Sequence, residues 1–194
     1  MLSKLKSKVE LLLTPLIDAL IRLNMKPIHC TLLGFVLTVL SVALLVAGTS
    51  LLLVAAVFLS GTVMDMVDGM LARRSRSQSS RGSFLDSVAD RYEESIFLLA
   101  LAYCGLCSYV AAICALIGSY MTSYARAKAE SLGMKKMGFI IFERAERVLL
   151  LAAGLIAAYV VGRAEVVEYT VLALAVASNI SALRRIVFVV RNLS

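Results

Sequence analysis

Two pairs of aspartates, each spaced for one face of a helix, are the residues of this chain best suited to chemistry. Asp65 and Asp68 are three residues apart, and Asp86 and Asp90 are four apart. Because a helix turns by about 100° per residue, each pair shares one face of its helix. Carboxylates in or near a membrane are costly, and they are normally paired, metal-bound or placed in a wet cavity. Four of them on two consecutive helices predict a bound positive charge. Ligation by oxygen alone favours Mg²⁺, Mn²⁺ or Ca²⁺ over zinc.

The aspartates lie at the ends of apolar runs long enough to cross a bilayer. The chain has 194 residues and is 60% hydrophobic, whereas soluble domains average about 45–50%. Since about 20 apolar residues span a bilayer, the runs predict an all-α integral membrane protein with six transmembrane helices. We treat residues 1–194 as one domain, in which 1–26 form an amphipathic interfacial helix and 27–194 a six-helix bundle. The expected spans are 29–48, 50–73, 83–105, 107–128, 142–162 and 166–190.

The basic residues predict how this bundle is oriented. With six spans, every Lys and Arg except Arg163 falls on the same side of the membrane. The positive-inside rule places that side, both termini and the aspartates in the cytoplasm, as in a multi-pass cell-membrane protein. The net charge of +7 then serves as a topology signal and as a surface for anionic lipid headgroups of the bilayer. We expect no nucleic-acid partner, because no aromatic residues are interleaved with the basic ones.

The full pattern around the aspartates reads D-x-x-D-G-x-x-A-R, a spacer of eight residues, and G-x-x-x-D-x-x-x-D. It resembles the signature of the CDP-alcohol phosphotransferases, integral membrane enzymes of phospholipid synthesis that use a CDP-linked alcohol and release CMP. The resemblance implies two divalent ions, Mg²⁺ or Mn²⁺, with Asp65, Asp68 and Asp86 as ligands. It assigns Asp90 as the remaining ligand or as the general base that takes the proton from the acceptor hydroxyl.

The other fixed positions of the pattern are expected to contact the CDP-lipid donor. Gly69 and Gly82 lack side chains, and Ala72 is small, so a nucleotide could lie against the helix backbone. Arg73 would direct a permanent cation toward phosphate. The competing interpretation of the glycines is close helix packing in the membrane.

The segment before the first span carries part of a second family pattern. Family members often have P-N-x-x-T here, and this chain reads Pro27-Ile-His-Cys-Thr31. The asparagine is missing, so the polar contact that it would make toward the nucleotide is not expected here. Thr31 keeps its hydroxyl, and we assign it to the CDP-lipid site.

A second group of cations bears on the acceptor. The strings S-Y-x-R-A-x-A-E and E-R-x-E-R resemble those of one branch of the family, the prokaryotic phosphatidylinositol-phosphate and archaetidylinositol-phosphate synthases. Those enzymes join inositol 1-phosphate to a CDP-activated diacyl- or dialkylglycerol. The resemblance implies a small phosphorylated polyol as acceptor and a homodimer. Cations that lie at the same depth in the membrane as the aspartates would suit an acceptor that carries its own phosphate. The residues assigned to this phosphate are Arg126, Lys128, Arg144, Arg147, Arg184 and Arg185.

Other substrates and one other class of protein stay open as alternatives. The same aspartates could serve glycerol 3-phosphate, serine, or CDP-inositol as donor with inositol phosphate as acceptor. A divalent-cation transporter also places carboxylates in membrane helices, but it needs a polar path to the far side, and Leu51–Leu59 is almost wholly apolar. A prenyltransferase of the UbiA type would need more spans and aspartate motifs far apart in the sequence.

Two short features have no part in this chemistry. Cys104 and Cys107 form a C-x-x-C without a second cysteine pair, and we expect them to be small packing residues. Glu93 and Glu94 follow Asp90 without an assigned role. We expect Glu94 to pair with Arg91.

Overall fold

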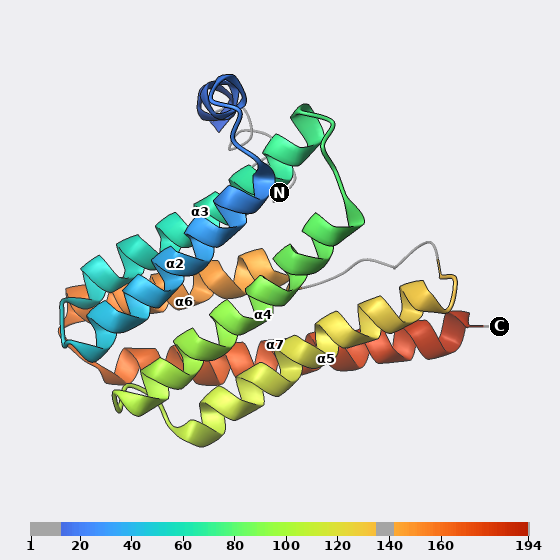
Figure 1. The fold of residues 1–194 in the computed structure, drawn as a ribbon. Coiled ribbons are helices and arrows are strands. Elements are labelled where there is room, and N and C mark those ends of the chain that lie inside the picture. Colours follow the sequence, from blue (N-terminus) through green and yellow to red (C-terminus); the bar gives the residue numbers. More distant parts are fainter. Residues whose placement is uncertain (1–12, 135–141, 194) are drawn as a thin grey trace. The chain divides into compact units, whose positions relative to one another are not determined.

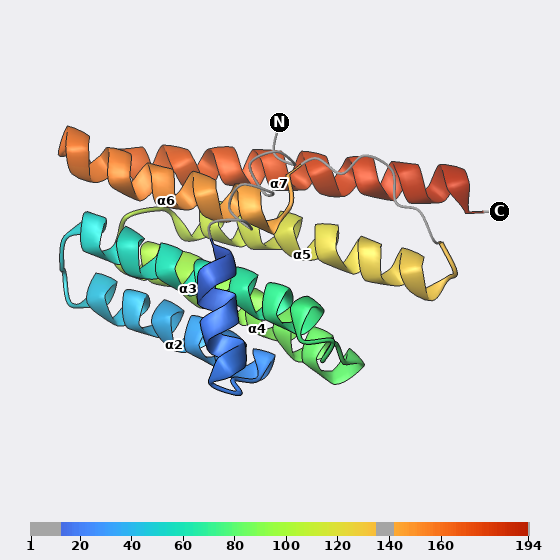
Figure 2. The same cartoon turned by 90° about the horizontal axis from the view of Figure 1, so that it is seen from above.

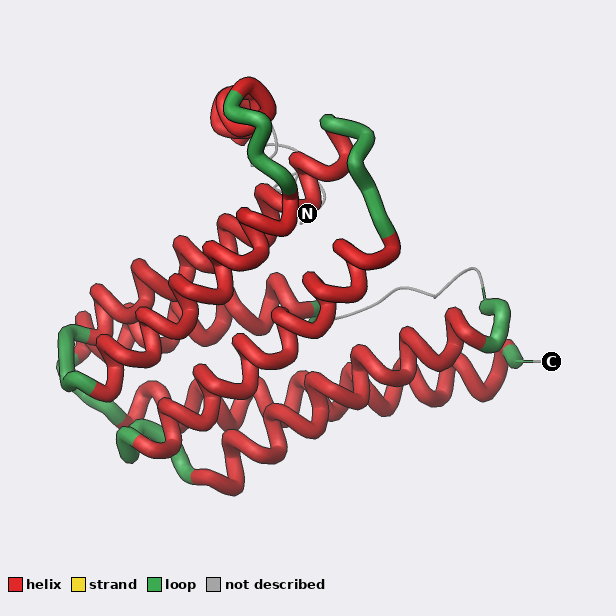
Figure 3. The backbone as a smooth tube through the Cα atoms, in the orientation of Figure 1, coloured by secondary structure: helices red, strands yellow, loops and turns green. Residues whose placement is uncertain are grey.

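Six long helices make up most of the protein in a computed structural model, which describes residues 13–134 and 142–193 (Figure 3). Each helix begins and ends within three residues of the range expected from the apolar runs. Residues 13–22 are helical as well, while the first twelve residues of the expected interfacial helix lie outside the described residues. The helices, labelled as in Figure 1, are α2 (Pro27–Val46), α3 (Leu51–Arg74), α4 (Ser80–Tyr103), α5 (Tyr109–Ser131), α6 (Arg144–Val161) and α7 (Glu165–Asn192).

Three of these helices, α2, α3 and α7, are long and apolar enough to cross a membrane. The all-helical fold and these three helices fit a membrane protein. The other three do not combine a sufficiently apolar stretch with few charged residues. In α4 the reason is visible in the sequence, since its first twelve residues include both Asp86 and Asp90. Six crossings and an interfacial position of residues 13–22 stay predictions.

Glycine ends two of the apolar runs where the sequence indicates a turn. Gly48 follows α2 with φ of 71°, and Gly162 follows α6 with φ of 70°. This left-handed region is open to glycine without a steric penalty. The Gly162 N–H donates to the Ala158 carbonyl at 2.9 Å, as a helix C-cap does.

The chain forms two compact units, which we describe separately. The first runs to Leu40 and resumes over Val57–Glu93. The second comprises Ser41–Ala56 and the chain from Glu94 onward. Helices α2, α3 and α4 each contribute residues to both units.

In the first unit, α2 and α3 approach closely at a pair of glycines. A Cβ atom on Gly61 would come within 3.0 Å of the Gly34 carbonyl oxygen. Small residues let membrane helices approach in this way. Residues 13–22 pack against the same helices through Ile17, which is 1% exposed and joins an apolar cluster with Val67 and Leu71.

In the second unit, α5 and α7 lie side by side, and α6 packs against α7 (Figures 1 and 2). Gly118 of α5 faces the α7 backbone so closely that a Cβ there would lie 2.7 Å from the Asn179 amide nitrogen. Asn179 also donates through Nδ2 to the Cys114 carbonyl at 2.8 Å. The two helices are therefore joined by a close backbone contact and a hydrogen bond.

Candidate active site

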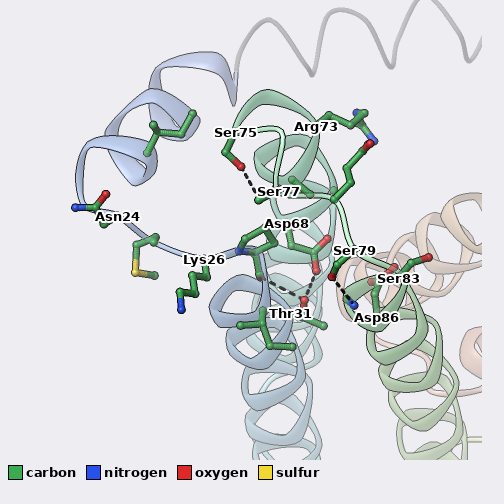
Figure 4. Close-up of a pocket in the computed structure, with 18 residues that line it drawn as sticks. Asn24, Lys26, Thr31, Asp68, Arg73, Ser75, Ser77, Ser79, Ser83 and Asp86 are labelled. Atoms are coloured by element: carbon green, nitrogen blue, oxygen red, sulfur yellow. Dashed lines mark hydrogen bonds between the residues drawn. The ribbon is translucent and has the colours of Figure 1, made fainter.

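A cavity of about 720 Å³ lies in the first unit, between the start of α2, the end of α3 and the start of α4. Figure 4 shows its wall, with Asp68 of α3 and Asp86 of α4 on neighbouring helices. The structure thus brings together most of the predicted metal and donor residues of this unit. Those lining the cavity are Thr31, Asp68, Gly69, Ala72, Arg73, Gly82 and Asp86.

The two glycines of the aspartate pattern are open to this cavity and are not pressed against another helix. Among the described residues, a Cβ on Gly69 would meet only the Arg73 Nη1 atom, at 3.5 Å. In the same described part of the chain, a Cβ on Gly82 would meet only the Ser79 Oγ atom, at 3.1 Å. Helix packing is therefore a poor explanation for them. It does explain Gly61, whose Cβ would meet the neighbouring helix.

Thr31 contacts an aspartate of the pattern directly. Its hydroxyl donates a hydrogen bond to Asp68 Oδ2, as drawn in Figure 4. Both residues are buried, with 6% of Thr31 and 5% of Asp68 exposed. A hydroxyl bonded to a carboxylate fixes the direction of its oxygens, which is how residues behind a metal site orient the ligands.

Asp65 and Asp90 do not line the cavity but meet next to it in the same unit, together with Glu93. One carboxylate oxygen from each of the three lies within 4.8 Å of the other two. Asp68 interacts electrostatically with both Asp65 and Asp86, which links this cluster to the cavity. The donor set consists only of oxygen, so its chemistry fits Mg²⁺ or Mn²⁺.

Glu93 is the member of the cluster that sequence reasoning left without a role. Its side chain is 3% exposed. It follows Asp90 by three residues, and that spacing on a helix was the available signal. Asp90 also receives a hydrogen bond from Arg91 Nη1 at 3.2 Å. The expected pairing of Arg91 with Glu94 is wrong, because Glu94 bonds to Arg147 instead.

Gly34 of α2 makes room for the Asp65 carboxylate. A Cβ on Gly34 would overlap Asp65 Oδ1 and would lie 3.3 Å from Asp65 Cγ and 3.1 Å from the Gly61 carbonyl oxygen. A larger residue at this position would have to displace the carboxylate or the neighbouring helix.

Three of the arginines assigned to the acceptor lie near one another in the second unit. Arg185 of α7 interacts electrostatically with Arg126 of α5 and Arg147 of α6. It is 7% exposed and donates from Nη1 to the Thr122 carbonyl at 2.7 Å. Its Nε atom is buried and has no hydrogen-bond partner within residues 13–134 and 142–193, which is uncommon for a polar atom in a folded protein.

The other residues assigned to the acceptor phosphate are less buried and therefore less suited to form a binding site inside the unit. Lys128 and Arg184 are exposed, and Arg144 is half-buried. Of the neighbours Arg184 and Arg185, only Arg185 points into the unit. Arg126 is also half-exposed, and it bonds to Glu130 at 2.9 Å on its own helix.

The C-x-x-C pair carries free thiols at the end of α4. Cys107 is buried, and burial, with a smaller contribution from the charge of Glu168, raises the pKa of its thiol to about 11. The thiolate is the form that binds metal or attacks a disulfide. At neutral pH Cys107 is protonated and suits packing.

Comparisons with known proteins agree on one family. The model of the CDP-alcohol phosphatidyltransferase family matches residues 25–189. Archaetidylinositol phosphate synthase of Pyrococcus horikoshii is 36% identical over 152 residues, which cover 78% of this chain and 80% of that protein. The protein of the same name from Methanothermobacter thermautotrophicus is 30% identical over 193 residues, covering 100% and 96%.

Solved structures of Mycobacterium tuberculosis phosphatidylinositol phosphate synthase are similar along most of the chain. The structure with CDP-DAG bound has a TM-score of 0.77 and 26% identity, covering 91% of this chain and 92% of that one. The structure in complex with manganese and citrate has a TM-score of 0.78 and 27% identity, covering 91% and 88%.

Proposed function

Because this chain belongs to the CDP-alcohol phosphatidyltransferase family and is therefore a transferase of phospholipid synthesis, we propose that its acceptor is inositol 1-phosphate. The donor is a CDP-linked lipid, CDP-archaeol or CDP-diacylglycerol, and the second product is CMP. The names of the relatives support the acceptor, and the CDP-DAG bound to a solved relative supports the donor.

The observation that carries the donor assignment is the cavity of the first unit. Gly69 and Gly82 leave its wall open, so a nucleotide can approach the backbone of both helices. Arg73 lies on the same wall and provides a guanidinium for the diphosphate. Asp68 and Asp86 would be ligands of the metal ions that accompany this diphosphate.

Asp65, Asp68, Asp86 and Asp90 would hold two divalent ions, and a solved relative contains manganese. When bound, such ions neutralise the diphosphate and the developing charge of an in-line displacement. The acceptor hydroxyl oxygen forms a bond to the lipid-bearing phosphorus, and the bond from that phosphorus to the bridging oxygen breaks. CMP leaves with that oxygen. Asp90 accepts the hydroxyl proton, while Arg91, bonded at 3.2 Å, holds its carboxylate in place.

The acceptor phosphate would bind to the arginines of the second unit. The unbonded Nε of Arg185 is a buried donor that a phosphate oxygen would satisfy. Arg126 and Arg147, which interact with Arg185 electrostatically, would add positive charge and further donors. An acceptor without an anionic group gives no reason to bury the donors of Arg147 and Arg185.

The test is a CMP-release assay with the purified protein, either CDP-lipid, and inositol 1-phosphate, glycerol 3-phosphate or serine as acceptor. We expect turnover with inositol 1-phosphate and Mg²⁺ or Mn²⁺, and no turnover after chelation. Asp86→Asn should lower kcat by at least about a hundredfold, since it removes a ligand and keeps the shape. Asp18→Asn is the control, because Asp18 is partly exposed and bonds to Arg74 outside this ligand set. Preferential use of another acceptor would overturn the proposal.

A further inference from the structure

A buried ion pair in the second unit joins Arg147 to a glutamate that has no part in the function described so far. Arg147 of α6 donates to Glu94 of α4 through Nε, at 2.6 Å from Oε1, and through Nη2, at 3.0 Å from Oε2. Ser119 of α5 donates to the same Oε2 at 2.6 Å. The exposed fractions are 9% for Glu94, 3% for Arg147 and 1% for Ser119. Three helices thus contribute one residue each.

The geometry of this pair fixes the Arg147 side chain without using all of its hydrogen-bonding capacity. Two parallel bonds between a guanidinium and a carboxylate set the plane and the direction of both groups. A guanidinium has five N–H donors, and Glu94 receives two of them. Three donors stay available for another anion. Arg147 is therefore oriented by Glu94 and can still bind a second oxygen ligand.

The charge of Glu94 also offsets part of the repulsion between Arg147 and the neighbouring arginine. Arg147 and Arg185 are both buried and interact electrostatically. Two buried cations without a counter-charge repel each other and lose hydration. Glu94 offsets the charge of Arg147 and so lowers this cost. The carboxylates of Glu143 and Glu130 act on Arg185 in the same sense, so both guanidiniums can stay buried in the absence of substrate.

We infer that Glu94 is a positioning residue for the acceptor: it holds the Arg147 guanidinium so that its remaining donors, with the unbonded Nε of Arg185, bind the acceptor phosphate. This inference rests on the proposed function. Ser119 supports the same arrangement by bonding to the Glu94 oxygen that faces Arg147 Nη2. Residue Glu94 itself does not touch substrate.

Steady-state kinetics of Glu94→Gln, with each substrate varied in turn, tests this role. The glutamine keeps the shape but loses the charge and replaces one acceptor oxygen with a donor. We expect the KM for inositol 1-phosphate to rise about tenfold, because the variant loses the equivalent of one charged hydrogen bond. The KM for the CDP-lipid should change less than about twofold. Arg147→Lys keeps the charge without the bidentate geometry and should show the same pattern. Ser119→Ala should raise only the acceptor KM, by about threefold.

The matched control is Glu168→Gln. Glu168 of α7 accepts a bond from the Ser108 hydroxyl at 3.0 Å in the same unit, so this variant loses a helix-joining carboxylate away from the arginines. It should leave both KM values unchanged.

If Glu94→Gln raises both KM values equally, or only lowers the melting temperature as Glu168→Gln does, the pair is structural and the inference is overturned. If Glu94→Gln does not fold, Ser119→Ala and Arg147→Lys decide by the same criterion. Failure of the proposed function looks different, since the wild-type protein would then prefer an acceptor other than inositol 1-phosphate.

Discussion

Replacing Gly34 by alanine should damage the proposed metal site although Gly34 is neither charged nor part of the aspartate pattern. The new Cβ would overlap Asp65 Oδ1 and lie 3.1 Å from the Gly61 carbonyl oxygen. Backbone at the helix crossing gives way less easily than a side chain, so the carboxylate has to move by about 1 Å to reach an ordinary van der Waals distance. Misorienting a ligand typically costs about 10- to 100-fold in metal affinity, and a displacement of about 1 Å costs about a hundredfold in rate.

The change in melting temperature of the Gly34→Ala variant is a second, independent measurement, and its expected sign depends on whether the clash exists. In a helix without steric conflict, alanine is more favourable than glycine by about 1 kcal/mol. Gly34→Ala would then raise the melting temperature. The contacts to Asp65 and Gly61 predict no such gain, because the clash offsets the better helix propensity.

Mn²⁺ titration followed by electron paramagnetic resonance, together with CMP release, measures the effect. Leu32→Ala is the control on the same helix, since Leu32 is 61% exposed and should bind Mn²⁺ like the wild type. A Gly34→Ala protein with unchanged Mn²⁺ affinity and a higher melting temperature would refute the reasoning. Asp65 would then not be a ligand held in place by the glycine.

Three further predictions concern other residues of the first unit and the orientation of α7. Thr31→Val removes the hydroxyl that bonds to Asp68, so CMP release should fall at least about tenfold. Thr31→Ser should restore it, and equal activity of both variants would contradict the role. Glu93→Gln should weaken Mn²⁺ binding about tenfold, and an unchanged titration would leave Glu93 outside the metal site. In a cysteine-free background, a membrane-impermeant maleimide should label Arg163→Cys only from outside and Arg191→Cys only from the cytoplasm. Labelling of both from one side would rule out a crossing by α7.

The positions of the helices could be read from the sequence because the apolar runs are bounded by strong local signals. The run of α2 stops at Gly48, and that of α6 stops at Gly162, both in the left-handed conformation. The polar link from Arg74 to Ser80 separates α3 from α4. Such signals depend on neighbouring residues only, so no knowledge of the packing was needed.

The cavity was also predictable, because the fixed spacing of the aspartate pattern places its residues on two helix faces. The contacts behind it were not. Gly34 lies in an apolar run, where a glycine indicates nothing beyond close packing, and its effect depends on Asp65 from another helix. Glu94 was expected to bond to Arg91 because Arg91 is close in sequence. Its partner Arg147 is 53 residues away, and no periodicity in the chain identifies such a pair.

The glycine contact between α5 and α7 determines how far each helix can slide along the other. Gly118 touches the α7 backbone at Asn179, and Thr122, one turn further along α5, receives the Arg185 hydrogen bond. A shift of one residue would be about 1.5 Å and would break both. Contacts with the backbone of α5 therefore determine the axial register of α7, and with it the depth of the Arg185 guanidinium. Substitutions that change nearby charges should alter what this guanidinium binds and leave its depth the same.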